Sequence, residues 1–578
     1  MATKLQRRRP GGRLLLVGLA TGLIGCGARR DVPELILTNA KIVTLDSAGR
    51  EATSIAIGGG KILGLADSVD PAWLTSKPTV IDLGGAVVAP AFTDHHAHLF
   101  NIGMALLNQR DHGRLAIDLS AVRSLADIDS LLRARAATLP KGTWIFGTGW
   151  SQASWGTEAL PTAEVLTRAA PDHPVFLART DGHAGWLNAL ALTIGGIDRT
   201  TAEPEGGSIV RLPSGEPSGI LLERANEIVA PGLPAPADSD IVAAFRLAAE
   251  ALAARGVVEV YDAGPLLYPG VVALNLDYGR YLALLVRADS VAPLPLRVNL
   301  MIPSPSRLAD SLLGARQLVT VLSPRIRITH LKLFGDGALG SRGAALSHPY
   351  ADDSTTSGVA RMTADQIAAL TRRALDRGLG VATHAIGDEA VRRTLDAYET
   401  VLHERAKLMP GRLRIEHFSY AHEQDFIRAA RLGVILSIQS NFNALPEDHP
   451  SFGAARLGAA NEARVYNWAR LRDMGAILAE GSDYFTTPGA PLAGFIATLE
   501  RRYAVGQALP DSVARRLAYR MNAVRFEPAG AAAGAFIAVG SRADLVAWSV
   551  NPMTVSRGEL GRVTATLVVN AGRVVVPR

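Results

Sequence analysis

The chain has little of what disulfide stabilisation or covalent catalysis requires. Cys26 is the single cysteine among 578 residues, so no disulfide can form within the chain. No Gly-x-Ser-x-Gly elbow stands out, and Cys26 lies close to the start of the chain. An enzyme that attacks its substrate with a serine or cysteine nucleophile is therefore not expected.

Excess charge is also scarce once the first segment is set aside. The formal net charge is +6, but residues 1–25 carry five basic residues and no acidic one. The rest of the chain then has 55 Lys and Arg against 54 Asp and Glu. No basic stripe interleaved with aromatic residues is present, so nucleic acid is not an expected partner. A hydrophobic content of 48% is typical of a globular enzyme.

The first 26 residues have the pattern of an export signal. A basic stretch, Lys4–Arg13, precedes an apolar run, Leu14–Ile24, which is too short to cross about 30 Å of hydrocarbon as a helix. The sequence Leu23-Ile24-Gly25-Cys26 resembles a bacterial lipobox, in which the cysteine receives the lipid. We therefore expect a signal peptide at 1–25 and an exported lipoprotein. Its lipid on Cys26 would be its only membrane contact, and it would face the periplasm or the cell exterior. Ordinary secretion with an incidental cysteine is the alternative.

Short β patterns at both ends of the chain enclose a central region of different character. Residues 35–45 read as a strand, and the turn Gly58–Gly60 joins two further strand patterns. Residues 543–548 and 565–576 have the same character. The expected arrangement is a small β-sandwich formed by 26–86 and 528–578, with a catalytic domain at 87–527 between them.

The central region alternates apolar runs with amphipathic helical stretches. Eight such runs with intervening helices are the number that a (β/α)8 TIM barrel requires, in the α/β class. Residues from about 105 to 250 are too many for one crossover and predict an insertion between barrel strands one and two. The eight runs are Val87–Phe92, Val257–Tyr261, Leu296–Met301, Ile326–Phe334, Leu379–Thr383, Leu413–Glu416, Val434–Ile438 and Ala476–Ala479.

Polar residues at the ends of these runs are the strongest functional signal. His96 and His98 alternate on an extended chain at the end of the first run, so both imidazoles would face one side. Similar side chains recur in or after the fourth, fifth, sixth and eighth runs, and the carboxyl ends of barrel strands converge on one mouth. These residues are Lys332, His384, His417 and Asp483.

Together these residues resemble the amidohydrolase superfamily, and the wider motifs resemble its branch of N-substituted formamide deformylases. The motifs are Pro90–His98, Gly149-Trp150, Arg179–Ala184, Lys332–Gly337, His384–Asp388, Arg414–His417 and Gly481–Asp483. The resemblance implies that His96, His98 and Asp483 hold one divalent metal and that His384 and His417 hold a second. It implies that Lys332 bridges them if its amine is carboxylated by CO2. The nitrogen-rich ligands favour zinc, and a single-metal site is the alternative.

Structural roles compete with several of these assignments. Lys332 could simply neutralise a buried carboxylate such as Asp336, and His384 and His417 could be core histidines. His183 could contact substrate or merely cap a loop. His95 should face away from the ligands, and His330 is a minor alternative ligand. Asp388 could orient His384 or cap the following helix.

The expected reaction follows from the charge of the metal. A bound cation lowers the pKa of water toward about 7, and the hydroxide attacks a carbonyl of a small amide-like substrate. Asp483 would move the proton to the leaving nitrogen, and His183 would steady the oxyanion.

Cleavage of a C–N bond of the amide or formamide type is favoured. A lactonase or esterase, and a non-catalytic solute-binding lipoprotein, are the alternatives. A homodimer is compatible with the sequence, which specifies no oligomeric state.

Overall fold

The computed structural model describes residues 32–577 with short gaps. The gaps are residues 47–48, 158, 205, 267–277, 406–410, 445–449, 466–467, 484–490, 501–509, 527–531 and 534–535. The predicted signal peptide, Cys26 and the predicted boundary at 527/528 lie outside the described residues. Of the helices described, none is long and apolar enough to cross a membrane.

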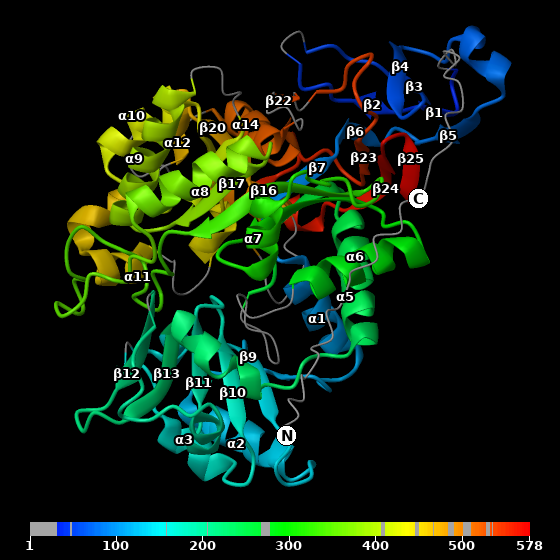
Figure 1. The fold of residues 1–578 in the computed structure, drawn as a ribbon. Helices are drawn as coiled ribbons and strands as arrows, with labels where there is room; N and C mark the ends of the chain where they lie inside the picture. The colour runs from blue at the N-terminus through cyan, green and yellow to red at the C-terminus, as the bar shows by residue number, and fades with distance from the viewer. Residues whose placement is uncertain are drawn as a thin grey trace, which may run out of the picture.

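Eight parallel strands form the central barrel, so the predicted fold class is confirmed (Figure 1). Each strand is paired with the next in chain order, and their side chains are largely buried because helices cover the outside of the barrel. The strands are β7 (Phe92–Ala97), β14 (Val257–Asp262), β15 (Arg297–Pro303), β16 (Ile326–Phe334), β17 (Gly380–Ala385), β18 (Leu413–His417), β19 (Ile435–Ile438) and β20 (Ile477–Glu480).

The first strand, β7, and the last, β20, meet at a seam closed by hydrogen bonds just beyond β20. The backbone N–H of Asp483 donates to the carbonyl of His96 over 2.7 Å. The carboxylate of Asp94 accepts from the N–H and the hydroxyl of Ser482 at 2.9 and 2.6 Å. A side chain of the first strand therefore fixes the end of the eighth.

The first barrel strand does not lie where the apolar pattern placed it. Val87–Phe92 was expected to be that strand, but Val87–Pro90 is β6 of a different sheet, and β7 begins at Phe92. The strand that enters the barrel contains Thr93, Asp94 and two histidines. Apolar patterning missed it because the polar residues of the site make up the strand itself.

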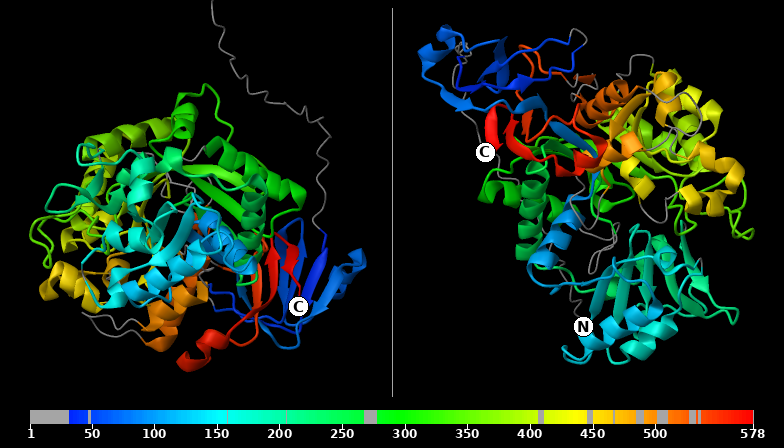
Figure 2. Two further views of the ribbon diagram at one scale, coloured as in Figure 1. Left: turned by 90° about the horizontal axis from the view of Figure 1, so that it is seen from below. Right: turned by 180° about the vertical axis from the view of Figure 1, so that it is seen from behind.

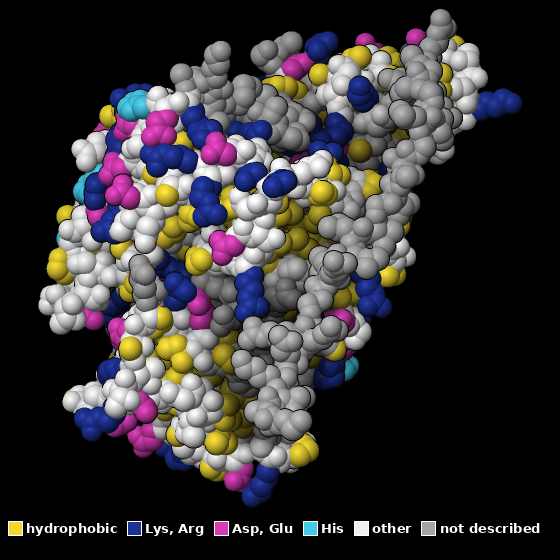
Figure 3. Space-filling view, viewed as in Figure 1, with side chains coloured by type: hydrophobic (Ala, Val, Ile, Leu, Met, Phe, Trp, Pro, Cys, Tyr) yellow, Lys and Arg dark blue, Asp and Glu magenta, His cyan; other side chains and the backbone are white. Residues whose placement is uncertain are grey.

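Amphipathic helices cover the barrel. Thr363 and Gln366 form a capping box that starts α8, and its buried face includes Ile367 and Thr371. On the face seen in Figure 3, basic and acidic side chains are interspersed over these outer helices. The helices of the barrel region are α6 (Tyr278–Val291), α7 (Arg307–Gly314), α8 (Ala364–Asp376), α9 (Asp388–Glu404), α10 (Glu423–Leu432), α11 (Pro450–Leu457), α12 (Trp468–Asp473), α13 (Pro491–Glu500) and α14 (Asp511–Ala523).

Two sheets packed face to face form a small domain from both parts of the chain (Figure 2). Leu37, Ile55, Val88, Leu567 and Val569 are among the buried residues between them. One sheet has the order β4-β3-β1-β5 and the other β2-β6-β23-β24-β25. Their strands are β1 (Leu35–Thr38), β2 (Lys41–Ile42), β3 (Ser54–Gly58), β4 (Lys61–Ala66), β5 (Thr79–Asp82), β6 (Val87–Pro90), β23 (Leu545–Trp548), β24 (Ala565–Asn570) and β25 (Arg573–Val576). Arg525–Phe526 and Ala532–Ala533 form a separate short pair, β21 and β22.

The segment between β7 and β14 builds a unit of its own, which lies below the barrel in Figure 1. Its six-stranded sheet has the order β12-β13-β11-β10-β9-β8. The chain leaves the barrel through α1 and returns through α5, and these two helices pack on each other. The elements are α1 (Leu99–Arg110), β8 (Ile117–Asp118), α2 (Leu125–Ala136), β9 (Ile145–Trp150), α3 (Ala163–Ala169), β10 (Val175–Arg179), β11 (Ala184–Leu187), α4 (Ala189–Ile194), β12 (Gly207–Arg211), β13 (Pro217–Glu223) and α5 (Asp238–Ala253).

Candidate metal centre and active site

Three side chains meet at the carboxyl end of the barrel in a geometry that could hold a metal ion. One ligand atom from each of His96, His98 and Asp483 lies within 4.8 Å of the others, and all three residues are buried. Nε2 of His98 is 2.9 Å from Oδ1 of Asp483, and Nε2 of His96 is 3.7 Å from the same oxygen. That oxygen is buried and receives no well-aligned hydrogen bond from the described residues. A buried carboxylate oxygen facing two imidazole nitrogens, with no aligned donor, fits a cation ligand.

A second group of side chains adjoins these three. Nζ of Lys332 lies 3.3 Å from Nε2 of His96, and Nδ1 of His417 lies 3.6 Å from Oδ2 of Asp483. The rings of His384 and His417 are 4.4 Å apart between centroids. The structure therefore brings together all six residues that the sequence nominated as metal ligands, from β7, the residue after it, β16, β17, β18 and the loop after β20.

Hydrogen bonds hold the imidazoles in fixed orientations. Nδ1 of His96 lies 2.6 Å from the carboxylate of Glu416, and Nδ1 of His98 lies 2.5 Å from the carbonyl of Gly264. Nδ1 of His417 lies 2.7 Å from the amide oxygen of Gln439. When Nδ1–H donates to such acceptors, the lone pair of Nε2 is left for a metal.

The backbone at two of the candidate ligands is strained. His417 and Asp483 have φ angles of 75° and 48°, in the left-handed region that residues with a Cβ seldom adopt. Such conformations persist where the surroundings fix them, and they cluster at functional sites.

Burial sets the protonation of this centre. Desolvation lowers the pKa of His96 to about 4 and the pKa of His384 and His417 well below the usual value, so the imidazoles are neutral near pH 7. Burial alone would raise the pKa of Asp483. The interactions with His96 and His98 outweigh burial, so the pKa is lowered and the carboxylate stays ionised. Desolvation also lowers the pKa of Lys332 to about 8. Neutral imidazoles and an ionised carboxylate are the forms that bind metals.

The insertion supplies a further histidine at the edge of the centre. The rings of His183 and His384 lie 5.3 Å apart. Nδ1 of His183 is 2.9 Å from Oε2 of Glu223, and the same oxygen accepts from Arg361 at 3.1 Å. His183 thus faces the centre with its ring oriented by a carboxylate, rather than merely capping a loop.

The structure does not support three of the alternative roles considered for residues near the site. The carboxylate of Asp336 accepts three backbone N–H bonds and makes no ion pair with Lys332 within the described chain. Asp388 neither orients His384 nor caps α9; it bonds Ser347 and lies 2.8 Å from His422. His330 does not face the metal candidates, because its ring lines a cavity at the other end of the barrel.

His95 faces away from the ligands, as its place on the strand predicts. Its Nε2 lies 2.9 Å from the carbonyl of Val524, and its ring stacks on Tyr261. His95 therefore packs the interior of the barrel below the centre.

Sequence reasoning did not select several side chains that orient the site. Glu416 was quoted only as part of a motif, although its position next to His417 on a buried strand was a usable signal. Glu223, Arg361 and Gln439 carry no local motif, and only the folded chain shows that they bond His183 or His417.

Comparisons with known proteins agree with this geometry, which is that of a metal-dependent hydrolase built on a TIM barrel. The chain matches the amidohydrolase family over residues 79–576 and belongs to that family.

Individual relatives extend the match over most of the chain. It is 33% identical over 475 residues to Protein LONG AFTER FAR-RED 3 of Arabidopsis thaliana, covering 81% of this chain and 78% of that one. It is 25% identical to the N-substituted formamide deformylase of Arthrobacter pascens, covering 91% and 95%. An uncharacterized metal-dependent hydrolase from Pyrococcus horikoshii OT3 superposes with a TM-score of 0.67 at 27% identity, covering 91% and 99%.

Proposed function

We propose that this chain hydrolyses a C–N bond of a small non-peptide amide, of the N-substituted formamide kind. The observation that carries the proposal is the convergence of His96, His98, Lys332, His384, His417 and Asp483 on one buried centre in a member of the amidohydrolase family. The relative from Arthrobacter pascens, which acts on N-substituted formamides by its name, supports the bond type.

His96, His98 and Asp483 would hold one divalent cation, with zinc favoured by the nitrogen ligands, and His384 and His417 would hold a second. When bound, such a cation lowers the pKa of water from 15.7 toward about 7 and polarises a carbonyl oxygen. Lys332 would join the two positions as a carbamate. Its pKa of about 8 supports this, because about a tenth of the amine is then neutral near pH 7, and the neutral amine is the form that reacts with CO2.

Two side chains of the chain would transfer the proton and stabilise the developing negative charge. Asp483 is ionised and would accept the proton of the attacking water and return it to the leaving nitrogen. His183, held by Glu223, would donate a hydrogen bond to the carbonyl oxygen as negative charge develops there. The insertion that carries His183 contacts this end of the barrel, where its Glu223 bonds Arg361, and would limit access of bulk water.

The test measures metal content and hydrolysis together. Purified wild type, His96→Ala and Asp483→Asn would be compared for bound metal by mass spectrometry and for hydrolysis of N-substituted formamides, acetamides, lactones and esters. We expect the wild type to hold one or two metals per chain and to cleave the formamides best. Both variants should lose metal, and kcat/KM should fall by about 1000-fold or more.

His403→Ala is the matched control, because His403 is exposed on α9 and should leave both readouts unchanged. Full metal content in both variants would overturn the metal assignment. Hydrolysis confined to lactones or esters would overturn the bond type.

A further inference from the structure

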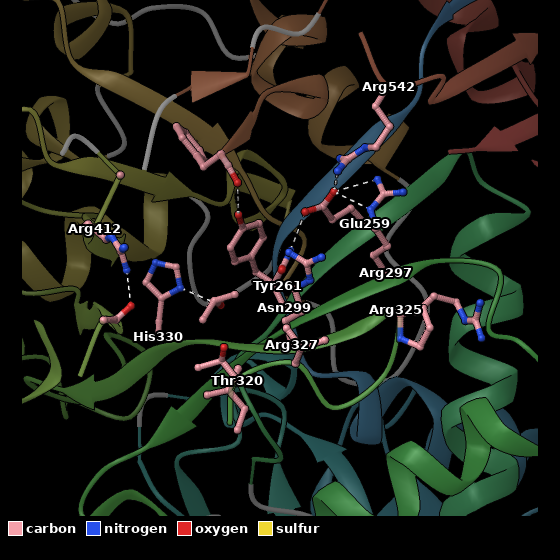
Figure 4. Close-up of a pocket in the computed structure, with 17 residues that line it drawn as sticks. Glu259, Tyr261, Arg297, Asn299, Thr320, Arg325, Arg327, His330, Arg412 and Arg542 are labelled. Carbon is pink, nitrogen blue, oxygen red and sulfur yellow. Dashed lines mark hydrogen bonds and ion pairs between the residues drawn. The ribbon is translucent and has the colours of Figure 1, made fainter. Parts of the chain in front are cut away.

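A second cavity lies at the amino-terminal end of the barrel, opposite the metal centre. Its volume is about 330 Å³. Its walls come from the starts of β14 to β18 and from two side chains near the small domain, as Figure 4 shows. The charged residues among its lining are Glu259, Arg297, Arg325, Arg327, Arg412 and Arg542.

Three of the five arginines have acidic partners. Arg297 and Arg542 both bond Glu259, at 2.9 and 2.6 Å, and both also bond Asp544. Arg325 bonds Asp289 at 2.6 Å. These ion pairs hold the walls of the cavity in place, and each of the carboxylates named here is already paired with an arginine.

The other two arginines have no acidic partner among the described residues. Arg412 donates to the carbonyl of Gly378, and the guanidinium of Arg327, which is exposed, makes no hydrogen bond or ion pair there. Two uncompensated guanidinium groups thus border a concave space, where low-dielectric walls strengthen their field.

The cavity is separated from the metal centre by a layer of side chains. Tyr261 forms part of its wall, and the guanidinium of Arg414 lies 4.5 Å from the centroid of the tyrosine ring. Arg414 in turn bonds Glu416, which holds His96. A molecule in this cavity would therefore contact neither the candidate metal ligands nor a substrate bound at them.

From this arrangement we infer that the cavity is a second binding site, for a small anion with at least two negative charges, such as a phosphate monoester or a dicarboxylate. Arg327 and Arg412 would bind the anion with charge-assisted, forked hydrogen bonds. Thr320 lines the same space and would add a neutral polar contact, whereas the amide of Asn299, which also lines it, already donates to Glu259 at 2.7 Å. The inference does not depend on the reaction proposed for the metal centre.

The test is calorimetric titration of the full chain with its metal. Inorganic phosphate and succinate would be titrated separately at constant ionic strength into wild type, Arg327→Gln/Arg412→Gln and Arg307→Gln. Arg307 is the matched control, because it is an exposed arginine at the start of α7, near the other end of the barrel.

We expect at least one of the two anions to bind the wild type and Arg307→Gln equally and to bind the double variant at least about tenfold more weakly. Phosphate that binds a metal instead would bind all three proteins alike. The tighter of the two anions identifies the ligand class. Equal affinity in the double variant, or no binding to the wild type, would overturn the inference. If the double variant does not fold, Arg327→Gln alone is informative, since this exposed side chain supports no described contact.

Discussion

At the scale of single residues, the carboxylate of Glu223 joins the insertion to the centre of the barrel. It is buried, its backbone has a φ of 52°, and it bonds both His183 and Arg361. A residue held in a strained conformation by two such partners is suited to orienting a neighbouring ring.

Glu223→Gln should therefore reduce catalysis without removing metal. The amide keeps the size of the side chain but loses the charge that orients His183, so kcat should fall roughly ten- to a hundredfold while metal content stays at the wild-type level. Steady-state kinetics and metal analysis would check this. Glu227→Gln, four residues further along and paired with Arg224, should change kcat little. Loss of metal in Glu223→Gln would show a structural role instead.

A second buried carboxylate, Glu480, should make stability depend on pH. Burial raises its pKa to about 8, against hydrogen bonds from Ser440 that act to lower it. In the unfolded chain the group ionises near its ordinary value of 4.5. Between these values the folded state binds more protons, so the free energy of unfolding should fall as pH rises, by at most about 1.4 kcal/mol per pH unit from this group.

Glu480→Gln has no ionisable group at this position, so its free energy of unfolding should lack this contribution to the pH dependence. Urea unfolding at pH 5, 6.5 and 8 should show the wild type losing stability relative to the variant as pH rises. A constant difference between the two proteins across this range would contradict the prediction.

At the scale of elements, the loop after β16 packs directly against the insertion. A Cβ added at Gly337 would lie 1.9 Å from Oε1 of Glu223, which is closer than real atoms approach. The loop and strand β13 therefore meet without room for a side chain at this point.

Gly337→Ala should push Glu223 away from His183. We expect a loss of about 1–3 kcal/mol in the free energy of unfolding from overpacking, with a fall in kcat. Denaturant unfolding and kinetics would measure both. Gly314→Ala at the end of α7 is the control, because a Cβ there meets nothing within 4 Å. Equal behaviour of the two variants would refute this account of the contact.

The elements also show what the sequence could predict. Seven of the eight apolar runs coincide with barrel strands because buried parallel strands are apolar on both faces. The first barrel strand was predicted too early in the chain. The apolar run Val87–Phe92 lies mostly in β6 of the small domain, and the barrel strand β7 is made largely of site residues. The six candidate ligands could be found because each lies at or near the end of a strand. Glu223 and Arg361 could not, because their contacts depend on how the insertion docks on the barrel.

At the scale of the whole molecule, an ion-pair network ties the small domain to the barrel. Asp544 is 1% exposed and accepts from Arg297 on β15 and from Arg525 and Arg542. It also accepts from the N–H of Ala571 at 2.7 Å. One carboxylate thus compensates arginines from both parts of the chain.

Asp544→Asn should destabilise the protein by about 3–5 kcal/mol, because it leaves the buried Arg525 without an acidic partner among the described residues. Arg297 and Arg542 would keep Glu259 as their one counter-charge. Asp376→Asn removes an exposed partner of Arg405 and should cost at most about 1 kcal/mol. Urea unfolding of both variants would measure the difference. A similar small effect for Asp544→Asn would mean that the network contributes little.

The way the small domain is assembled also has a consequence for synthesis on the ribosome. β6 pairs with β23, which is made more than 450 residues later, so its sheet stays incomplete until translation is nearly finished. Until then an apolar strand edge is exposed on the nascent chain, open to chaperones or to pairing with another copy. Slow elongation or early termination should therefore favour aggregation over release of a partly active enzyme.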